Sequence, residues 1–358
     1  MIQARFRKAR PKLRDSQGFT LDVEFQAAEG VTVLFGPRGA GKTMALEVIA
    51  GLVEPDEGRI LVDDQILFDG GAGVNLPPKA RPCGYVIRDY ALFPHMTLRD
   101  NLVFAAACRR LPRLERHRRV NEMLERFRLT DVATRRPREA SGGEKLRCAI
   151  ARALVGRPKA LLVDEPAHGL DPPLRAELYG LLRQIRSDFG ISLLVATQDL
   201  DECFELGEEM LVLAAGRVVQ AGRPCQVIEQ PATVEVAGML GDFNLLPVEI
   251  TALDPVRKTS RFRLGQRELT GPYFPGRLRG DRVTLCVRPE ELLVLPAGGK
   301  PGSNQVPAEL LRVIEKPQTV RLQFAGGIAA EMPRAEWEQR KHNREWVVEF
   351  PPQHLRVL

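Results

Sequence analysis

The chain has few cysteines, and no two of them are spaced for a zinc site or a disulfide scaffold. Its six cysteines are scattered through 358 residues without a C-x-x-C motif, which is typical of reduced thiols in a cytosol. The sequence also lacks any run of about 20 apolar residues, the length that a membrane-spanning helix needs. No long apolar segment follows Met1 to Arg5, so we do not expect a signal peptide. Contact with a membrane is therefore expected to come through a partner.

Aromatic residues are also scarce, at 6% of the chain. The formal net charge at pH 7 is +6, so basic residues outnumber acidic ones. Much of the basic excess lies between Arg109 and Arg138, where apolar residues recur at near-helical spacing. This pattern predicts amphipathic helices with solvated basic faces, and proximity to an anionic membrane surface is the alternative. The basic residues are not interleaved with aromatic ones as in RNA-binding modules, so no nucleic-acid partner is expected.

The strongest motif is Gly-Pro-Arg-Gly-Ala-Gly-Lys-Thr at positions 36–43, which fits the P-loop pattern G-x-x-x-x-G-K-[ST]. An apolar segment, Val31 to Phe35, precedes it, and a helical pattern follows to Ala50, so a mere glycine-rich turn is disfavoured. Glycines and a helix N-terminus direct backbone N–H groups at phosphate oxygens. Lys42 is expected to reach the β- and γ-phosphates, and the Thr43 hydroxyl to hold Mg²⁺. The predicted nucleotide-binding residues of this segment are Gly36, Pro37, Arg38, Gly39, Ala40, Gly41, Lys42, Thr43 and Met44.

Two further segments carry chemistry. The apolar run from Ala160 ends in Asp164 and Glu165, where one carboxylate suits Mg²⁺ and the next suits polarisation of an attacking water. Between this run and the P-loop lies Ser-Gly-Gly-Glu at 141–144, which opens a helical stretch and forms a second anion cradle. Since the chain already has one cradle, the second is expected to serve the nucleotide of another subunit. A plain capped helix start is the alternative.

With the three motifs in this order, the chain resembles the ATP-binding subunits of ABC transporters over its first two-thirds. The resemblance implies that two copies sandwich two ATP molecules. Ser141, Gly142, Gly143 and Glu144 would then complete the site of the opposite copy, with Asp171 linking the two sites. It also places Arg88 at the Q-loop position and Gln198 at the switch position.

The chain departs from the family pattern in four ways. Arg88 replaces a glutamine, Gln198 replaces a histidine, and Met44 replaces a second hydroxyl after the P-loop lysine. The signature is flanked by Ala140 and Leu146 in place of the commoner leucine and glutamine. Losing one preorganised contact to a transition state lowers a rate by roughly a hundred- to a thousandfold. We expect an active ATPase with Lys42, Glu165 and Gln198 as catalytic residues. The alternative is an ATP-binding regulatory subunit that hydrolyses weakly, and Arg88 either lowers competence or donates to the γ-phosphate.

Short segments at 39–43, 92–95 and 142–145 resemble the molybdate, sulfate and iron(III) importer ATPases in particular. This likeness implies ATP and Mg²⁺ as cofactors and an inorganic oxyanion or metal as the transported substrate. The implied partners are a second copy of the chain, integral membrane permease subunits and, indirectly, an extracytoplasmic solute-binding protein. The expected location is peripheral, on the cytoplasmic face of the membrane.

The pattern predicts two domains. Residues 1–240 read as an α/β P-loop NTPase domain of the ABC type, with a helical subdomain at about 89–156 and a closing hairpin at 212–219. Residues 245–358 resemble a small all-β, OB-like barrel of the TOBE/Mop type. That domain is expected to be regulatory or structural. Its predicted strands are Val248–Ala252, Arg282–Val287, Ala308–Ile314, Thr319–Phe324 and Trp346–Phe350.

Adenine recognition has one candidate. Family members stack an aromatic ring on the base from a loop about twenty residues before the P-loop, and Phe19 is the aromatic residue near enough. A core position at the start of a strand is the alternative for Phe19.

Overall fold

A computed structural model describes residues 1–11, 18–109, 111–297, 302–343 and 345–358. Position 110, inside the predicted helical stretch, lies outside the described residues. The chain divides into two compact units, Met1–Gln230 and Pro231–Leu358. This division falls before the predicted boundary at residue 240, because helix α8 (Val234–Met239) belongs to the second unit.

The first unit contains a six-stranded sheet that is parallel except at one edge. The strand order is β11-β10-β3-β9-β8-β7, and only β10 and β11 pair in antiparallel fashion, as the predicted hairpin. Strands β3, β8 and β9 are buried along their whole length, which explains their uninterrupted apolar sequences. The strands are β3 (Val31–Phe35), β7 (Cys83–Val86), β8 (Ala160–Asp164), β9 (Ser192–Thr197), β10 (Glu209–Ala214) and β11 (Arg217–Gly222).

A second, antiparallel sheet of this unit has the order β2-β1-β4-β5-β6. Its inward side chains share one core with those of helix α1 (Lys42–Ala50) and of the parallel strands β8 and β9. Burying α1 in this core fixes the loop before it. The strands are β1 (Ile2–Arg10), β2 (Phe19–Ala27), β4 (Glu57–Val62), β5 (Gln65–Asp69) and β6 (Val74–Asn75).

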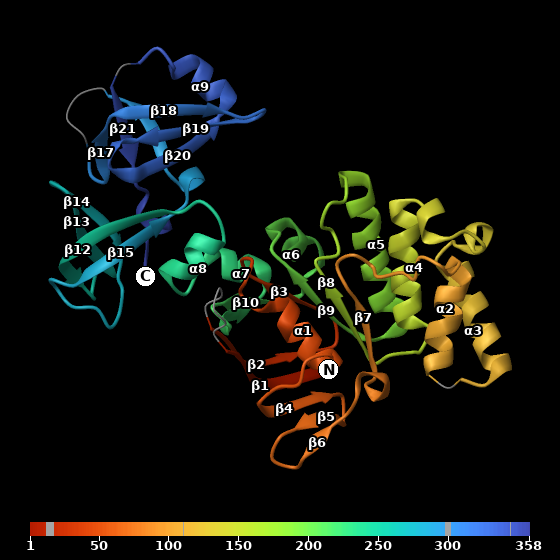
Figure 1. The fold of residues 1–358 in the computed structure, drawn as a ribbon. Helices are drawn as coiled ribbons and strands as arrows, with labels where there is room; N and C mark the ends of the chain where they lie inside the picture. The colour runs from red at the N-terminus through yellow and green to blue at the C-terminus, as the bar shows by residue number, and fades with distance from the viewer. Residues whose placement is uncertain (12–17, 110, 298–301, 344) are drawn as a thin grey trace. The chain divides into compact units, whose positions relative to one another are not determined.

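Helices cover the rest of the first unit. Helix α2 packs against α3 and α4, and Figure 1 shows these three gathered at the end of the unit away from β1 and β2. They fall within the predicted helical subdomain. Among the described residues, no helix is both long and apolar enough to cross a membrane. The helices are α2 (Leu98–Cys108), α3 (Arg113–Arg126), α4 (Gly142–Leu154), α5 (Pro172–Phe189), α6 (Leu200–Leu206) and α7 (Pro224–Glu229).

The second unit is built mainly of antiparallel strands in three sheets, ordered β14-β13-β12-β15-β22, β16-β21-β17 and β18-β19-β20. All three contribute to one apolar core, in which Trp337 and Trp346 stack with ring centroids 5.8 Å apart. Its one α-helix besides α8, within the described residues, is α9 (Arg334–Arg340). The strands are β12 (Asn244–Asp254), β13 (Thr259–Leu264), β14 (Arg267–Pro272), β15 (Arg282–Val287), β16 (Leu293–Pro296), β17 (Gln305–Ala308), β18 (Leu310–Glu315), β19 (Thr319–Phe324), β20 (Ile328–Pro333), β21 (Trp346–Glu349) and β22 (Arg356–Val357).

Candidate nucleotide site

The predicted site lies at one edge of the parallel sheet. Strands β3, β9, β8 and β7 are consecutive parallel neighbours, so their carboxyl ends, and the segments that follow them, meet there. A cavity of about 760 Å³ opens at this edge. Eight predicted residues line it, namely Arg38, Gly39, Gly41, Lys42, Thr43, Met44, Arg88 and Glu165.

The loop before α1 has the backbone shape that the P-loop motif predicts. A Cβ atom on Gly36 would lie 2.2 Å from the carbonyl oxygen of Leu213, so only glycine fits there. Gly41 has a φ of 108°, which other residues rarely adopt. Within the described part of the chain, no side chain caps the start of α1. Its first N–H groups have no partner within the helix and are available to phosphate oxygens.

Lys42 is folded back onto this loop. Its Nζ donates to the carbonyl oxygens of Gly36 and Pro37, at 2.8 and 3.1 Å, and lies 3.7 Å from Glu165 Oε1. Burial lowers the pKa of Lys42, and the carboxylates of Glu165 and Asp164 oppose that shift. The amine is thus held beside the loop by weak acceptors that phosphate oxygens can replace.

Thr43 and Asp164 form the predicted Mg²⁺ pair. The Thr43 hydroxyl donates to Asp164 Oδ2 at 2.9 Å, and the other oxygen, Oδ1, is buried without a hydrogen-bond partner among the described residues. Burial raises the pKa of Asp164, and the bond from Thr43 offsets part of that shift. A buried carboxylate oxygen and a hydroxyl fit Mg²⁺, which commonly takes one or two protein oxygens and completes its shell with phosphates and water. When bound, Mg²⁺ neutralises charge on the phosphates.

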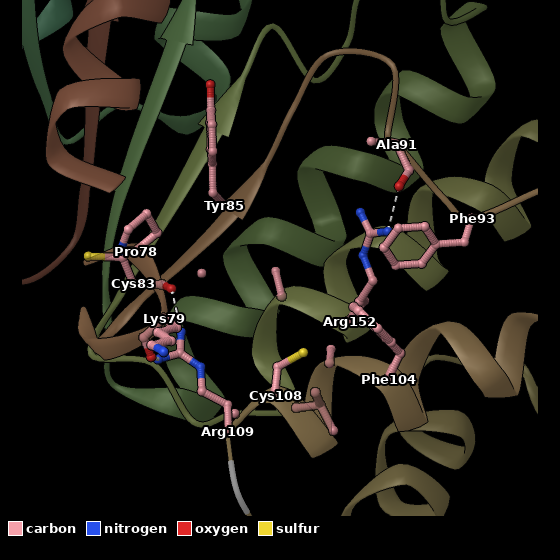
Figure 2. Close-up of a pocket in the computed structure, with 15 residues that line it drawn as sticks. Pro78, Lys79, Cys83, Tyr85, Ala91, Phe93, Phe104, Cys108, Arg109 and Arg152 are labelled. Carbon is pink, nitrogen blue, oxygen red and sulfur yellow. Dashed lines mark hydrogen bonds between the residues drawn. The ribbon is translucent and has the colours of Figure 1, made fainter. Parts of the chain in front are cut away.

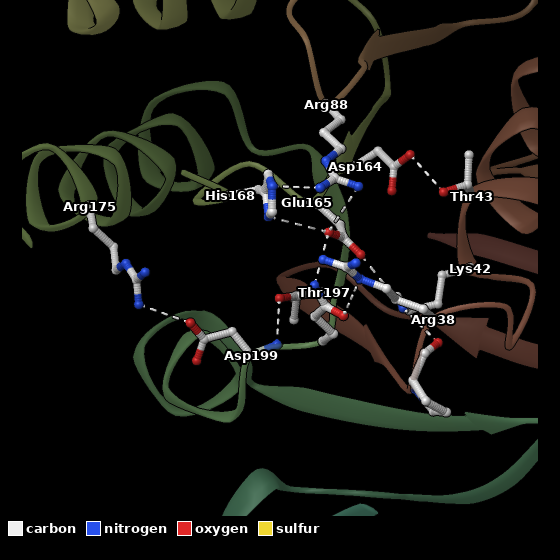
Figure 3. Close-up of polar contacts among 12 residues, drawn as sticks. Arg38, Lys42, Thr43, Arg88, Asp164, Glu165, His168, Arg175, Thr197 and Asp199 are labelled. Atoms are coloured by element: carbon white, nitrogen blue, oxygen red, sulfur yellow. Dashed lines mark hydrogen bonds and ion pairs between the residues drawn. The ribbon is translucent and has the colours of Figure 1, made fainter. Parts of the chain in front are cut away.

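Glu165 stands at the centre of the polar groups (Figure 3). Its φ of 42° lies in the left-handed region, and its N–H is fixed by a 2.8 Å bond to the carbonyl oxygen of Ala196 in β9. Such local strain is often found at active sites. Its Oε2 lies 3.5 Å from Gln198 Nε2 and 3.8 Å from Arg88 Nη1. Glu165 thus lines the same cavity as Lys42 and Thr43, and its role in orienting an attacking water stays a prediction.

The structure adds two contacts that the sequence analysis missed. Arg38 Nε donates to Gln198 Oε1 at 3.3 Å, which orients the amide so that Nε2 faces Glu165. His168 lies beside Arg88 and Glu165. The sequence held one signal for His168, its position three residues after Glu165. In the structure the two residues lie in one turn, in which His168 N donates to Glu165 O.

The predicted cross-subunit residues do not line this cavity. Ser141 caps α4 by accepting from Glu144 N at 3.2 Å, while Glu144 accepts from Ser141 N at 2.6 Å. Asp171 caps α5 by accepting from Leu174 N at 3.0 Å. Ser141, Gly142 and Asp171 are exposed. Their present contacts are those of helix caps, and exposure leaves them accessible to a second copy.

Phe19 lies at the start of β2 and lines the cavity. It is half-buried and also packs against the core. A Cβ atom on Gly41 would come within 3.0 Å of the Phe19 ring. The ring therefore adjoins the phosphate loop, and both earlier interpretations of Phe19 agree with its position.

Comparison with known proteins decides the family. Residues 20–168 match the family described as ABC transporter. The chain is 36% identical over 305 residues to the trehalose/maltose import ATP-binding protein of Thermococcus litoralis, covering 82% of this chain and 81% of that protein. The chain belongs to the ATP-binding subunits of ABC transporters. It is accordingly an ABC-type ATPase.

Other relatives share this family and differ in cargo. Identity to the molybdenum import ATP-binding protein of Paramagnetospirillum magneticum is 41% over 298 residues, covering 80% of this chain and 82% of that protein. Identity to the spermidine/putrescine import ATP-binding protein of Nitratidesulfovibrio vulgaris is 36% over 280 residues, covering 76% and 72%. A dimeric ATP-binding cassette solved in a post-hydrolysis state with ADP and Pi matches 63% of this chain and 99% of its own, at 25% identity and a TM-score of 0.54.

Proposed function

We propose that this ATPase energises import of an inorganic oxyanion or metal of the molybdate, sulfate or iron(III) class. It works at the cytoplasmic face of the membrane, bound to separate permease subunits that receive cargo from an extracytoplasmic solute-binding protein. The observation that carries the ATPase core is the single cavity that gathers Lys42, Thr43, Arg88 and Glu165. The cargo class is supported by the likeness to the molybdenum import relative.

We further propose that two copies form an ATP sandwich. The signature turn at 141–144 is absent from the lining of the cavity, and its first two residues, Ser141 and Gly142, are exposed. A dimer would bring that turn of one copy to the γ-phosphate held by the other, where the N-terminus of α4 favours an anion. The dimeric cassette with ADP and Pi supports this arrangement.

A second cavity, of about 440 Å³, supports the proposed permease contact. Figure 2 shows Phe93, Phe104 and Arg152 beside it. Phe104 is 44% exposed although it is apolar. Arg152 donates to the carbonyl oxygens of Tyr90 and Ala91, both at 2.6 Å. These residues follow Arg88 closely, so an occupant of this cavity is positioned to influence the nucleotide site.

Phe104→Asp tests the permease contact. The variant should lose co-purification with the permease while its basal ATPase rate changes less than twofold, because Phe104 does not line the nucleotide cavity. Leu114→Asp is the matched control, since Leu114 is 85% exposed on α3 and does not line the second cavity. Equal retention of the permease by both variants would place the permease contact elsewhere.

The cargo class is tested by uptake in a strain that lacks the chain. Uptake of labelled molybdate, sulfate and iron(III) is measured beside maltose and spermidine, with the wild-type chain or Glu165→Gln as complement. Loss of one inorganic substrate, restored only by the wild type, supports the proposal. Loss of maltose or spermidine uptake alone overturns the cargo class and leaves the ATPase assignment intact.

The second unit is proposed to be a regulatory module with an OB-like fold, which its antiparallel strands and single core support.

The weakly hydrolysing alternative for the whole chain rests on Arg88 and Gln198, which both contact Glu165. Single-turnover hydrolysis by the purified protein separates a slow chemical step from slow product release.

A further inference from the structure

Arg88 and His168 form a pair beside the catalytic carboxylate (Figure 3). Arg88 Nη2 lies 2.5 Å from His168 Nε2. The other ring nitrogen of His168, Nδ1, lies 4.0 Å from Glu165 Oε2. Arg88 Nη1 lies 3.8 Å from the same oxygen. The arginine therefore bridges the histidine and the carboxylate.

The contact with Arg88 assigns a hydrogen-bonding role to each ring nitrogen of His168. A guanidinium has donors only, so His168 Nε2 is the acceptor in this contact. In the tautomer that accepts at Nε2, the ring N–H is on Nδ1. Nδ1 lies 4.0 Å from Glu165 Oε2, so the N–H of the ring is near the carboxylate, within reach of a small movement rather than in a direct hydrogen bond.

We propose that Arg88 and His168 act as a positioning pair, which holds the Glu165 carboxylate in the orientation that polarises the attacking water. This inference rests on the ATPase activity and on Glu165 as the residue that orients water.

The two oxygens of Glu165 have different neighbours, and this difference gives the pair its role. Lys42 approaches Oε1, whereas Arg88, His168 and Gln198 all approach Oε2. When ATP is bound, Lys42 is drawn to phosphate oxygens, and the hold on Oε1 weakens. The Oε2 contacts are then left to define the angle of the carboxylate. Glu165 is 11% exposed, so few waters compete with them.

Substitutions at His168 separate positioning from packing. His168→Ala should lower kcat about tenfold, with the KM for ATP changed less than twofold, because the residue touches Glu165 rather than the nucleotide. His168→Asn should recover most of the rate, since its amide N–H can occupy the place of Nδ1–H. His168→Gln carries its amide one bond further and should not recover it. His117→Ala, on the exposed face of α3, is the matched control.

A double-mutant cycle tests whether the two residues act as a pair. Arg88→Gln alone should lower kcat, because the histidine then loses the contact in which its Nε2 accepts. In that background, His168→Ala should cost less than twofold. Each rate is measured in single turnover with saturating ATP, and each variant is checked for thermal stability and for binding of a fluorescent ATP analogue.

Three outcomes would overturn the positioning pair. The first is a rate for His168→Ala within twofold of the wild type, and the second is a full tenfold loss of rate from His168→Ala in the Arg88→Gln background. The third is a faster enzyme after either single change. The last would identify the pair as an inhibitory clamp on Glu165. If His168→Ala does not fold, the Asn and Gln variants still decide, since equal rates for the two contradict a role for the Nδ1 proton. Absence of hydrolysis in the wild type would instead count against the ATPase assignment.

Discussion

Thr43 and Asp164 lie 121 positions apart in the chain, yet the Thr43 hydroxyl donates a 2.9 Å hydrogen bond to Asp164 Oδ2. The threonine is the second residue of α1, and the aspartate is the last residue of β8. Helix α1 packs on β8 in the shared core, and that packing brings the two oxygens together. The contact between these two oxygens, which we propose as the Mg²⁺ pair, is therefore a direct consequence of the fold.

Removing either oxygen should weaken Mg²⁺-dependent nucleotide binding. Thr43→Val keeps the shape of the side chain and deletes the hydroxyl, while Asp164→Asn removes the charge. Both should raise the Mg²⁺ concentration needed for half-maximal hydrolysis by tenfold or more, because few protein oxygens hold the ion. A Mg²⁺ titration of ATPase rate measures this. An unchanged midpoint in both variants would contradict the assignment of the pair.

Much of the fold and part of the site could be predicted from the sequence. Strand β3 and the P-loop were predicted because one short segment contains three recognisable patterns in succession. These are an apolar run typical of a buried parallel strand, a glycine-rich turn and a helical pattern. Strands β15 and β19 fall at the predicted residues. The predicted strand 308–314 is divided between β17, which pairs with β21, and β18, which pairs with β19. Neither this change of partner strand nor the register irregularity in β18 can be recognised from the sequence pattern.

The contacts around Glu165 were harder to predict. Arg88 was recognised only as a departure from a pattern, and nothing in its neighbours showed that it would bridge His168 and Glu165. Such contacts depend on how loops after β7 and β8 turn at the sheet edge, which residue spacing does not specify. The link from Arg38 to Gln198, across 160 positions, had no local signal at all.

Glu165→Gln should abolish multiple turnover and keep ATP binding. The amide preserves the size of the side chain but is a poor acceptor for a proton from water. The ATP-bound dimer should accumulate, because its separation would follow hydrolysis. ATPase rate and sedimentation measured on the same sample check both expectations. Turnover equal to the wild type would remove Glu165 from the mechanism.

Glu202 should make the stability of the first unit depend on pH. It is 1% exposed at the start of α6, and burial raises its pKa to about 7. Between about pH 4.5 and 7 the folded chain keeps this proton while the unfolded chain releases it, so stability falls as pH rises through that window. The loss at pH 8 is on the order of 3 kcal/mol.

Glu202→Gln, a neutral mimic of the protonated acid, should therefore raise the melting temperature at pH 8 by about 5 °C or more and leave it nearly unchanged at pH 5. Glu205→Gln is the matched control, because Glu205 is exposed on the same helix. Melting curves at the two pH values give the comparison. A gain of equal size at both would show that the proton on Glu202 is not involved.

Mixing two inactive variants tests the proposed sandwich most directly. Ser141→Arg places a bulky cation in the signature turn, and Lys42→Ala removes the P-loop amine. Each variant alone should hydrolyse little, because both of its composite sites contain one defect. A mixed dimer pairs one intact site with one doubly broken site, so mixing should restore part of the activity if a single site can work. The restored rate should rise faster than linearly with protein concentration, as expected of a dimer. Full activity of Ser141→Arg alone, at concentrations where it is monomeric, would mean that each copy completes its own site and that the signature turn serves only as the cap of α4.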